Sequence, residues 1–228
     1  MARSFDNLFI GGSWVPAGAA FDDLNPADGT VWARVADGNG GIAVRAIESA
    51  QAAFPQWSGL TYSERAHYML KVADEFERRR DDLVAALQGE GGGWFGKGMF
   101  ESGYVPEVFR AAAAMTYNAI GEVLPSDHGK VSLAMRRAMG VVTVISPWNF
   151  PTLLTARGLA FPIAAGNCVV LKPSEETPYT GGVIFAEIFE AAGVPPGVLN
   201  VVTCSRENVP AVGDMIVEHP LVKGISFT

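Results

Sequence analysis

The sequence predicts an α/β fold in which an open parallel β-sheet is flanked by helices and carries a small β arm. The first observation is a continuous β-branched run at residues 141–145, which is typical of a strand buried on both faces. The second is alternation, because four predicted strands are separated by three helical stretches, as in right-handed βαβ units. The third is composition: 49% hydrophobic and 18% charged residues in a chain of 228 residues exclude wholesale disorder.

The first 120 residues are expected to form short strands followed by three helices. LFIGGSWV is an apolar stretch broken at Gly11 and Gly12, and NPADG has the composition of a turn. A glycine-rich stretch at residues 89–98 is expected to interrupt the helical region. The spacing of apolar residues predicts helices over residues 42–54, 61–87 and 105–120.

The remaining residues carry the arm and the parallel sheet. Residues 121–139 are expected to form two short strands around a turn at residues 126–129. Four strands are predicted at residues 141–145, 168–172, 198–202 and 224–227. The helices between them are predicted at residues 152–165, 178–192 and 208–217.

Charge and composition exclude several classes of function. The net charge is −7, from 17 Lys and Arg against 24 Asp and Glu, which argues against nucleic-acid or membrane partners. The sequence lacks an apolar run of about 18 residues, so no spanning helix is expected. Two cysteines cannot build a disulfide framework, and three scattered histidines do not predict a metal site. We therefore expect a soluble, cytoplasmic protein.

Two loops at the carboxyl ends of the predicted strands carry candidate site residues. Ligands of parallel α/β sheets bind at that edge. In the loop at residues 146–151, the amide of Asn149 could donate a hydrogen bond to a developing oxyanion. The alternative is a stiff loop around a buried Trp148. After the next strand, Lys172 could donate to the hydroxyls of a ribose and Glu175 could accept from them, although a surface ion pair is equally compatible with this spacing.

Other motifs give weaker signals. The stretch from Gly91 to Lys97 matches both GxGxxG and GxxxxGK by spacing, which would suggest a phosphate-binding loop and phosphoryl transfer. Such loops follow a strand, whereas a helix precedes this one, so a helix–helix connection is the favoured interpretation. Cys168 lies within a strand and is expected to be a small buried residue. Cys204 lies in a loop near Arg206, where a reactive thiol is possible.

Four motifs together resemble a known family. VISPWNFP, LKPSEETP, GVPPGVLNVV and ISFT, in that order, are similar to the first half of the NAD(P)-dependent aldehyde dehydrogenase superfamily. The resemblance extends from about Leu8 to Thr228. It implies that residues 1–120 and 140–228 form an NAD-binding domain of that family. It also implies that residues 121–139 are an oligomerisation arm, as in a dimer or tetramer.

The resemblance assigns roles to individual residues. Asn149 matches the asparagine whose amide helps to form the oxyanion hole. Lys172 and Glu175 match the pair that binds the adenosine ribose, and Glu175 would repel a 2′-phosphate, which favours NAD over NADP. The other residues that we assign to cofactor binding are Ile145, Ser146, Pro147 and Trp148 on the nicotinamide side, Ser174 beside the ribose pair, and the aromatic residue Phe227.

The implied activity is oxidation of an aldehyde to a carboxylic acid. In the family a cysteine thiolate forms a thiohemiacetal, hydride passes to the nicotinamide, and a glutamate activates water to hydrolyse the thioester. That cysteine and glutamate follow the ISFT segment, and neither Cys168 nor Cys204 matches the nucleophile. We therefore expect an N-terminal portion of an aldehyde dehydrogenase, inactive alone. The alternative is a catalytically silent nucleotide-binding or assembly module.

Two features depart from the family pattern. Cys204 stands where many members have glycine, and its side chain would narrow the adenine pocket. The segment EGGGWFGK replaces the more usual ETGK-type sequence.

Overall fold

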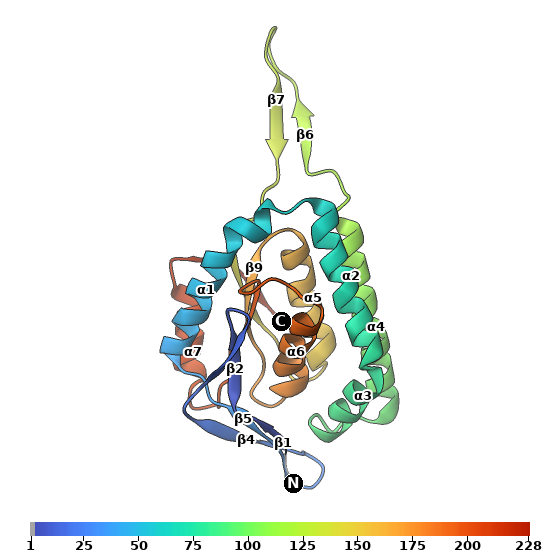
Figure 1. The fold of residues 1–228 in the computed structure, drawn as a ribbon, viewed down its shortest axis with the longest axis vertical. Helices are drawn as coiled ribbons and strands as arrows, with labels where there is room; N and C mark the ends of the chain where they lie inside the picture. The colour runs from blue at the N-terminus through green and yellow to red at the C-terminus, as the bar shows by residue number, and fades with distance from the viewer. Residues whose placement is uncertain (1–2) are drawn as a thin grey trace.

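The computed structural model describes residues 3–228, which form three β-sheets and a set of helices packed mainly around the central sheet (Figure 1). The central sheet has six strands, in the order β11 (Val222–Phe227), β8 (Val141–Ile145), β9 (Cys168–Lys172), β10 (Leu199–Val201), β2 (Asn7–Ile10) and β3 (Ser13–Pro16). The first four are parallel, which confirms the prediction. The hairpin of β2 and β3 extends this sheet with antiparallel pairing, an addition that the sequence did not predict.

Crossover helices connect the four parallel strands. They are α5 (Pro151–Ala164), the π-helix η1 (Tyr179–Val183) with α6 (Ile184–Ala191), and α7 (Val209–Glu218). Figure 1 shows α1 (Gly40–Gly59) and α7 on one face of the sheet, and α5 and α6 on the other. All five residues of β9 are buried, as expected of a central strand covered on both faces.

A second helical layer packs outside α5 and α6. It consists of α2 (Tyr62–Arg78), α3 (Arg80–Gly89) and α4 (Phe95–Met115). The rings of Phe76 on α2 and Phe109 on α4 are stacked at 5.5 Å, and Phe185 of α6 meets Phe76 edge-on at 5.2 Å. This buried aromatic contact fixes the outer helices to the crossover helices.

Three sequence predictions about helices were wrong in their boundaries. The single helix predicted over residues 61–87 is two helices, because the backbone leaves the helical conformation at Arg79. The helix predicted to begin at residue 105 begins ten residues earlier and ends at Met115. Gly98 lies inside that helix at a close approach, since a Cβ there would be 3.2 Å from Val84 of α3. The helix predicted over residues 178–192 begins as a π-helix.

Two smaller sheets complete the fold. One contains β1 (Arg3–Phe5), β5 (Val31–Ala36) and β4 (Ala20–Leu24). The other is the predicted arm, a hairpin of β6 (Gly121–Leu124) and β7 (Ser132–Met135) that projects away from the body (Figure 1). None of the helices within residues 3–228 combines the length and apolar character needed to cross a membrane.

Candidate functional site

A row of three residues lies at the carboxyl edge of the parallel sheet. Ile145, the last residue of β8, is in register with Lys172 of β9 on one side and with Phe227 of β11 on the other. The N–H of Ser146 donates to the carbonyl of Lys172 at 3.2 Å. The sheet therefore brings together three strand ends that the sequence predicted to contribute to one site.

The loop after β9 holds a chain of alternating charges. The side chain of Lys172 is 7% exposed, and its Nζ donates to the carbonyl of Pro173 at 3.1 Å. The same Nζ lies 3.6 Å from Oε2 of Glu175, whose Oε1 lies 3.3 Å from Nε of Arg206. The hydroxyl of Ser174 accepts from the N–H of Glu176 at 3.2 Å, which shapes the turn. This loop thus presents one buried ammonium and one partly neutralised carboxylate.

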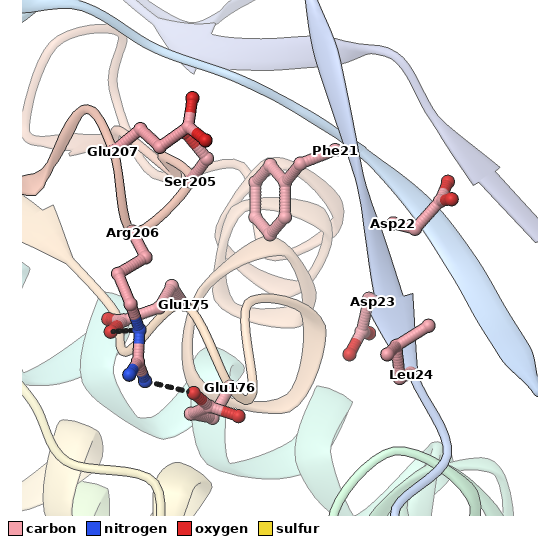
Figure 2. Close-up of a pocket in the computed structure, with 9 residues that line it drawn as sticks. All are labelled: Phe21, Asp22, Asp23, Leu24, Glu175, Glu176, Ser205, Arg206 and Glu207. Atoms are coloured by element: carbon pink, nitrogen blue, oxygen red, sulfur yellow. Dashed lines mark hydrogen bonds and ion pairs between the residues drawn. The ribbon is translucent and has the colours of Figure 1, made fainter. Parts of the chain in front are cut away.

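A cavity of about 330 Å³ opens beside this loop (Figure 2). It lies between β4, the loop after β9 and the loop after β10. Figure 2 shows the Arg206 guanidinium joined to Glu175 and Glu176, with the residues of β4 on the opposite side of the cavity. The lining residues are Phe21, Asp22, Asp23, Leu24, Glu175, Glu176, Ser205, Arg206 and Glu207. The predicted loop after β9 and the loop after β10 therefore share one cavity.

The wall of the cavity contains a buried carboxyl group that the sequence did not identify. Asp23 is 2% exposed, and its Oδ2 has no hydrogen-bond partner among residues 3–228. Burial, together with the negative charge of Glu90, raises the pKa of Asp23 to about 9. Burial also raises the pKa of Glu90 to about 7, against the lowering effect of the hydrogen bonds that it accepts from Thr180 and Tyr179. Both pKa shifts favour retention of a proton by this buried pair of carboxyl groups.

The loop after β8 presents a free amide donor. Oδ1 of the exposed Asn149 accepts from the N–H of Phe150 at 3.1 Å, which leaves its NH₂ group without a partner among the described residues. Ser146 is buried, and within the described part of the chain its hydroxyl has no hydrogen-bond partner. Trp148 is 62% exposed, so the alternative of a loop built around a buried Trp is wrong. Pro147 is half-buried.

A partly buried ion pair lies behind this loop, and sequence reasoning missed it. Glu101 is fully buried and accepts from the N–H groups of Thr152 and Leu153 at 2.8 and 2.9 Å. Nζ of Lys97 lies 3.0 Å from Glu101 and 4.7 Å from the centre of the Phe150 ring. The spacing of Lys97 and Glu101, four residues apart, was the available signal, but it also fits an exposed helix pair.

The glycine-rich stretch is a connection between two helices. It joins α3 to α4, as the favoured interpretation predicted, but it is shorter than predicted, because α4 already includes Gly96. Lys97 is paired within the protein rather than poised at a phosphate site. The hypothesis of a phosphate-binding loop therefore fails on structural context.

Neither cysteine is suited to nucleophilic chemistry. Both are free and buried. Burial raises the pKa of Cys168 to about 12 and that of Cys204 to about 11. Cys204 belongs to the hydrophobic core and does not line the cavity, so the expectation of a reactive thiol at this position is wrong. Within residues 3–228, three or more His, Cys, Asp or Glu side chains nowhere gather as a metal site would require.

Comparison with known proteins decides the family. The model of the aldehyde dehydrogenase family matches residues 14–228. The chain belongs to the aldehyde dehydrogenase family. Vanillin dehydrogenase of Pseudomonas sp. (strain HR199 / DSM 7063) is 38% identical over 228 residues, covering 97% of this chain and 46% of that protein.

Solved structures of aldehyde dehydrogenases agree with this assignment. A NAD-dependent benzaldehyde dehydrogenase from Corynebacterium glutamicum matches with a TM-score of 0.91 and 36% identity, over 97% of this chain and 48% of that one. Lactaldehyde dehydrogenase from Escherichia coli matches with a TM-score of 0.94 and 33% identity, over 99% and 47%. This aldehyde dehydrogenase chain thus spans about half the length of the curated relatives that it matches.

Proposed function

We propose that this chain forms the NAD-binding half of an enzyme that oxidises an aldehyde to a carboxylic acid. The observation that carries the proposal is the edge row of Ile145, Lys172 and Phe227, with Glu175 and the free Asn149 amide beside it. We also propose a cytoplasmic location, since both cysteines are free thiols, the state that a reducing compartment maintains.

The polar groups of the site fit a dinucleotide. The Lys172 ammonium donates one hydrogen bond to the carbonyl of Pro173, and its other N–H groups can donate to a ligand. The Glu175 carboxylate can accept from two ribose hydroxyls, and the buried Ser146 hydroxyl still lacks a partner. We propose that Lys172, Ser174 and Glu175 hold the adenosine ribose, and that the other assigned residues line the nicotinamide side: Ile145, Ser146, Pro147, Trp148 and Phe227.

The oxidation would need a hydride acceptor and a hydrogen-bond donor to the aldehyde oxygen. When bound, NAD supplies the hydride acceptor. The Asn149 amide would donate to the aldehyde oxygen as negative charge develops on it, which selectively stabilises the transition state. Anchoring of its Oδ1 by the Phe150 N–H orients the amide before substrate arrives, so no reorganisation is needed during the reaction.

The first experiment is a titration of the purified chain with NAD and NADP. We expect NAD to bind about tenfold more tightly, because the Glu175 carboxylate opposes a 2′-phosphate at a cost of roughly 1.4 kcal/mol. Glu175→Gln should narrow that difference by improving NADP binding. Glu207→Gln is the matched control, because it removes a charge from the same cavity without a contact to Lys172. Equal affinities of the unmodified chain for NAD and NADP would contradict the assignment of NAD.

Oxidation itself needs a separate measurement. NADH formation from an aldehyde, in protein purified from its natural source, tests the proposed activity. NAD binding without NADH formation would favour the silent nucleotide-binding module.

We further propose that the arm of β6 and β7 mediates self-association as a dimer or tetramer. Val123 is 76% exposed and its cross-strand partner Leu133 is 57% exposed, so both apolar side chains lie on one solvated face of the hairpin. A two-stranded hairpin is marginal by itself, and exposed apolar patches mark interaction surfaces.

Replacing both Val123 and Leu133 by Ser is expected to convert an oligomer to monomers. The reason is that the double substitution removes the apolar area of the hairpin face on which both side chains lie, and this area is what would be buried between subunits. Sedimentation velocity would measure the mass of each species. Lys130→Gln near the hairpin tip is the control and should leave the mass unchanged. A monomeric mass for the unmodified chain would refute a role of the arm in self-association.

A further inference from the structure

Two buried glutamates accept hydrogen bonds at the starts of two crossover helices. Glu101 accepts from the N–H groups of Thr152 and Leu153 in the first turn of α5. Glu90 accepts from the N–H groups of Tyr179 and Thr180 in the first turn of η1, at 2.6 and 2.8 Å. The first N–H groups of a helix have no partner within the helix, so a buried helix start needs an outside acceptor. Both acceptors come from one segment, residues 90–101.

The two helix starts are also bonded to each other. The hydroxyl of Thr152 donates to the carbonyl of Thr180 at 2.8 Å, and that of Thr155 donates to the carbonyl of Gly181 at 3.0 Å. All four of these residues are buried. The bonds form a continuous path from Glu90 through Thr180 and Thr152 to Glu101. Networks of this kind, with each partner satisfied, hold a single backbone arrangement.

This path ends beside both loops of the candidate site. Helix α5 begins at Pro151, two residues after Asn149, and η1 begins at Tyr179, four residues after Glu175. Lys97 pairs with Glu101 and lies over the ring of Phe150. Neither glutamate is part of the cavity lining. Glu101 can therefore affect a ligand only through the backbone of the loops, whereas Glu90 can also act through its neighbour Asp23 in the cavity wall.

We infer that Glu101 and Glu90 are positioning residues for the cofactor site. Glu101 sets the loop that carries Asn149, on the nicotinamide side, and Glu90 sets the loop that carries Glu175, on the adenosine side. A charged acceptor for two adjacent N–H groups fixes both the position and the direction of a helix start. The inference rests on the proposed function, because it assumes that these two loops bind the two halves of NAD.

The test compares NAD with AMP, which carries only the adenosine half. Glu101→Ala should weaken NAD binding by about tenfold and leave AMP binding nearly unchanged, since only the nicotinamide loop loses its anchor. Glu101→Gln should lose less, because one amide oxygen can accept from both N–H groups, as Oε2 does now. Glu90→Gln should weaken the binding of both ligands, because the two N–H groups of η1 donate to different oxygens of Glu90 and glutamine keeps only one acceptor oxygen.

Glu107→Gln is the matched control. Glu107 lies on the same helix as Glu101 but is exposed and paired only with Arg110, so both affinities should be retained. Hydrogen exchange provides a second readout: in Glu101→Ala the amides of Thr152 and Leu153 should exchange faster, while those of β9 stay protected. If Glu101→Ala does not fold, Glu101→Gln and Lys97→Met allow the same comparison of NAD with AMP binding, with a smaller expected loss of NAD affinity.

Two results would overturn the inference. One is an equal loss of NAD and AMP binding in the Glu101 variants, which is the pattern of general destabilisation. The other is unchanged binding together with faster exchange at Thr152 and Leu153. Failure of the unmodified chain to bind either NAD or AMP would instead reject the proposed function.

Discussion

Asp23→Asn is expected to stabilise the chain at alkaline pH and to flatten the dependence of its stability on pH. Asp23 is buried in the cavity wall beside Glu90, and its pKa is raised to about 9. In the unfolded chain an aspartate titrates near 3.9. Between these two values the folded state holds a proton that the unfolded state has released.

The sign of the effect follows from that difference. Because the folded state binds the extra proton, the free energy of unfolding falls as pH rises, by about 1.4 kcal/mol per pH unit for one proton. Below the unfolded pKa both states are protonated and the penalty is absent. Asparagine has no proton to lose, and its NH₂ group can donate toward Glu90 at every pH. The advantage of the variant should therefore grow steadily between about pH 5 and about pH 8.

Urea denaturation across that pH range measures the free energy of unfolding directly. Asp22→Asn is the matched control, since Asp22 is the exposed neighbour of Asp23 in the same cavity. The control should follow the pH profile of the unmodified chain. Parallel profiles for Asp23→Asn and the unmodified chain would show that Asp23 is not protonated in the fold.

Local patterns predicted the parallel sheet and the edge where its loops meet. The strand at residues 141–145 is a run of β-branched residues, and Lys172 stands at the end of the next strand. Strand direction alone then places Ile145 and Lys172 at one edge. The hairpin of β2 and β3 could not be placed in this way, because its pairing with β10 joins residues about 190 positions apart and follows no local signal.

The buried carboxyl groups around the site could not be predicted from the sequence for a similar reason. Glu90 and Glu101 accept from residues 51 to 90 positions away, and a glutamate beside glycines gives no indication of full burial. Asp23 likewise alternates with exposed neighbours on an edge strand and would be read as a surface charge. In each case tertiary packing, and not local propensity, decides the role of the carboxyl group.

Two neighbouring glycines in η1 should respond in opposite ways to the same added methyl group. A Cβ at Gly182 would lie 2.5 Å from Cγ and 3.1 Å from Cβ of Pro173. A proline ring has little freedom to move aside, so Gly182→Ala must shift either η1 or the loop. Such overpacking costs about 1–3 kcal/mol. A Cβ at Gly181 would meet Pro173 and Pro151 at 3.4 and 3.5 Å, which are ordinary contacts.

The clash at Gly182 should also affect the cofactor site, because Pro173 lies between Lys172 and Ser174 and a shift of Pro173 would move both. We expect Gly182→Ala to lower Tm, by about 2–4 °C for each kcal/mol lost in a chain of this size, and to weaken AMP and NAD together. Gly181→Ala should keep both affinities and raise Tm slightly, because alanine restricts the unfolded backbone more than glycine does. Calorimetry and ligand titration on the two variants measure both quantities. Equal stability and equal affinities in the two variants would mean that the contact between η1 and Pro173 does not fix the loop that holds Lys172 and Glu175.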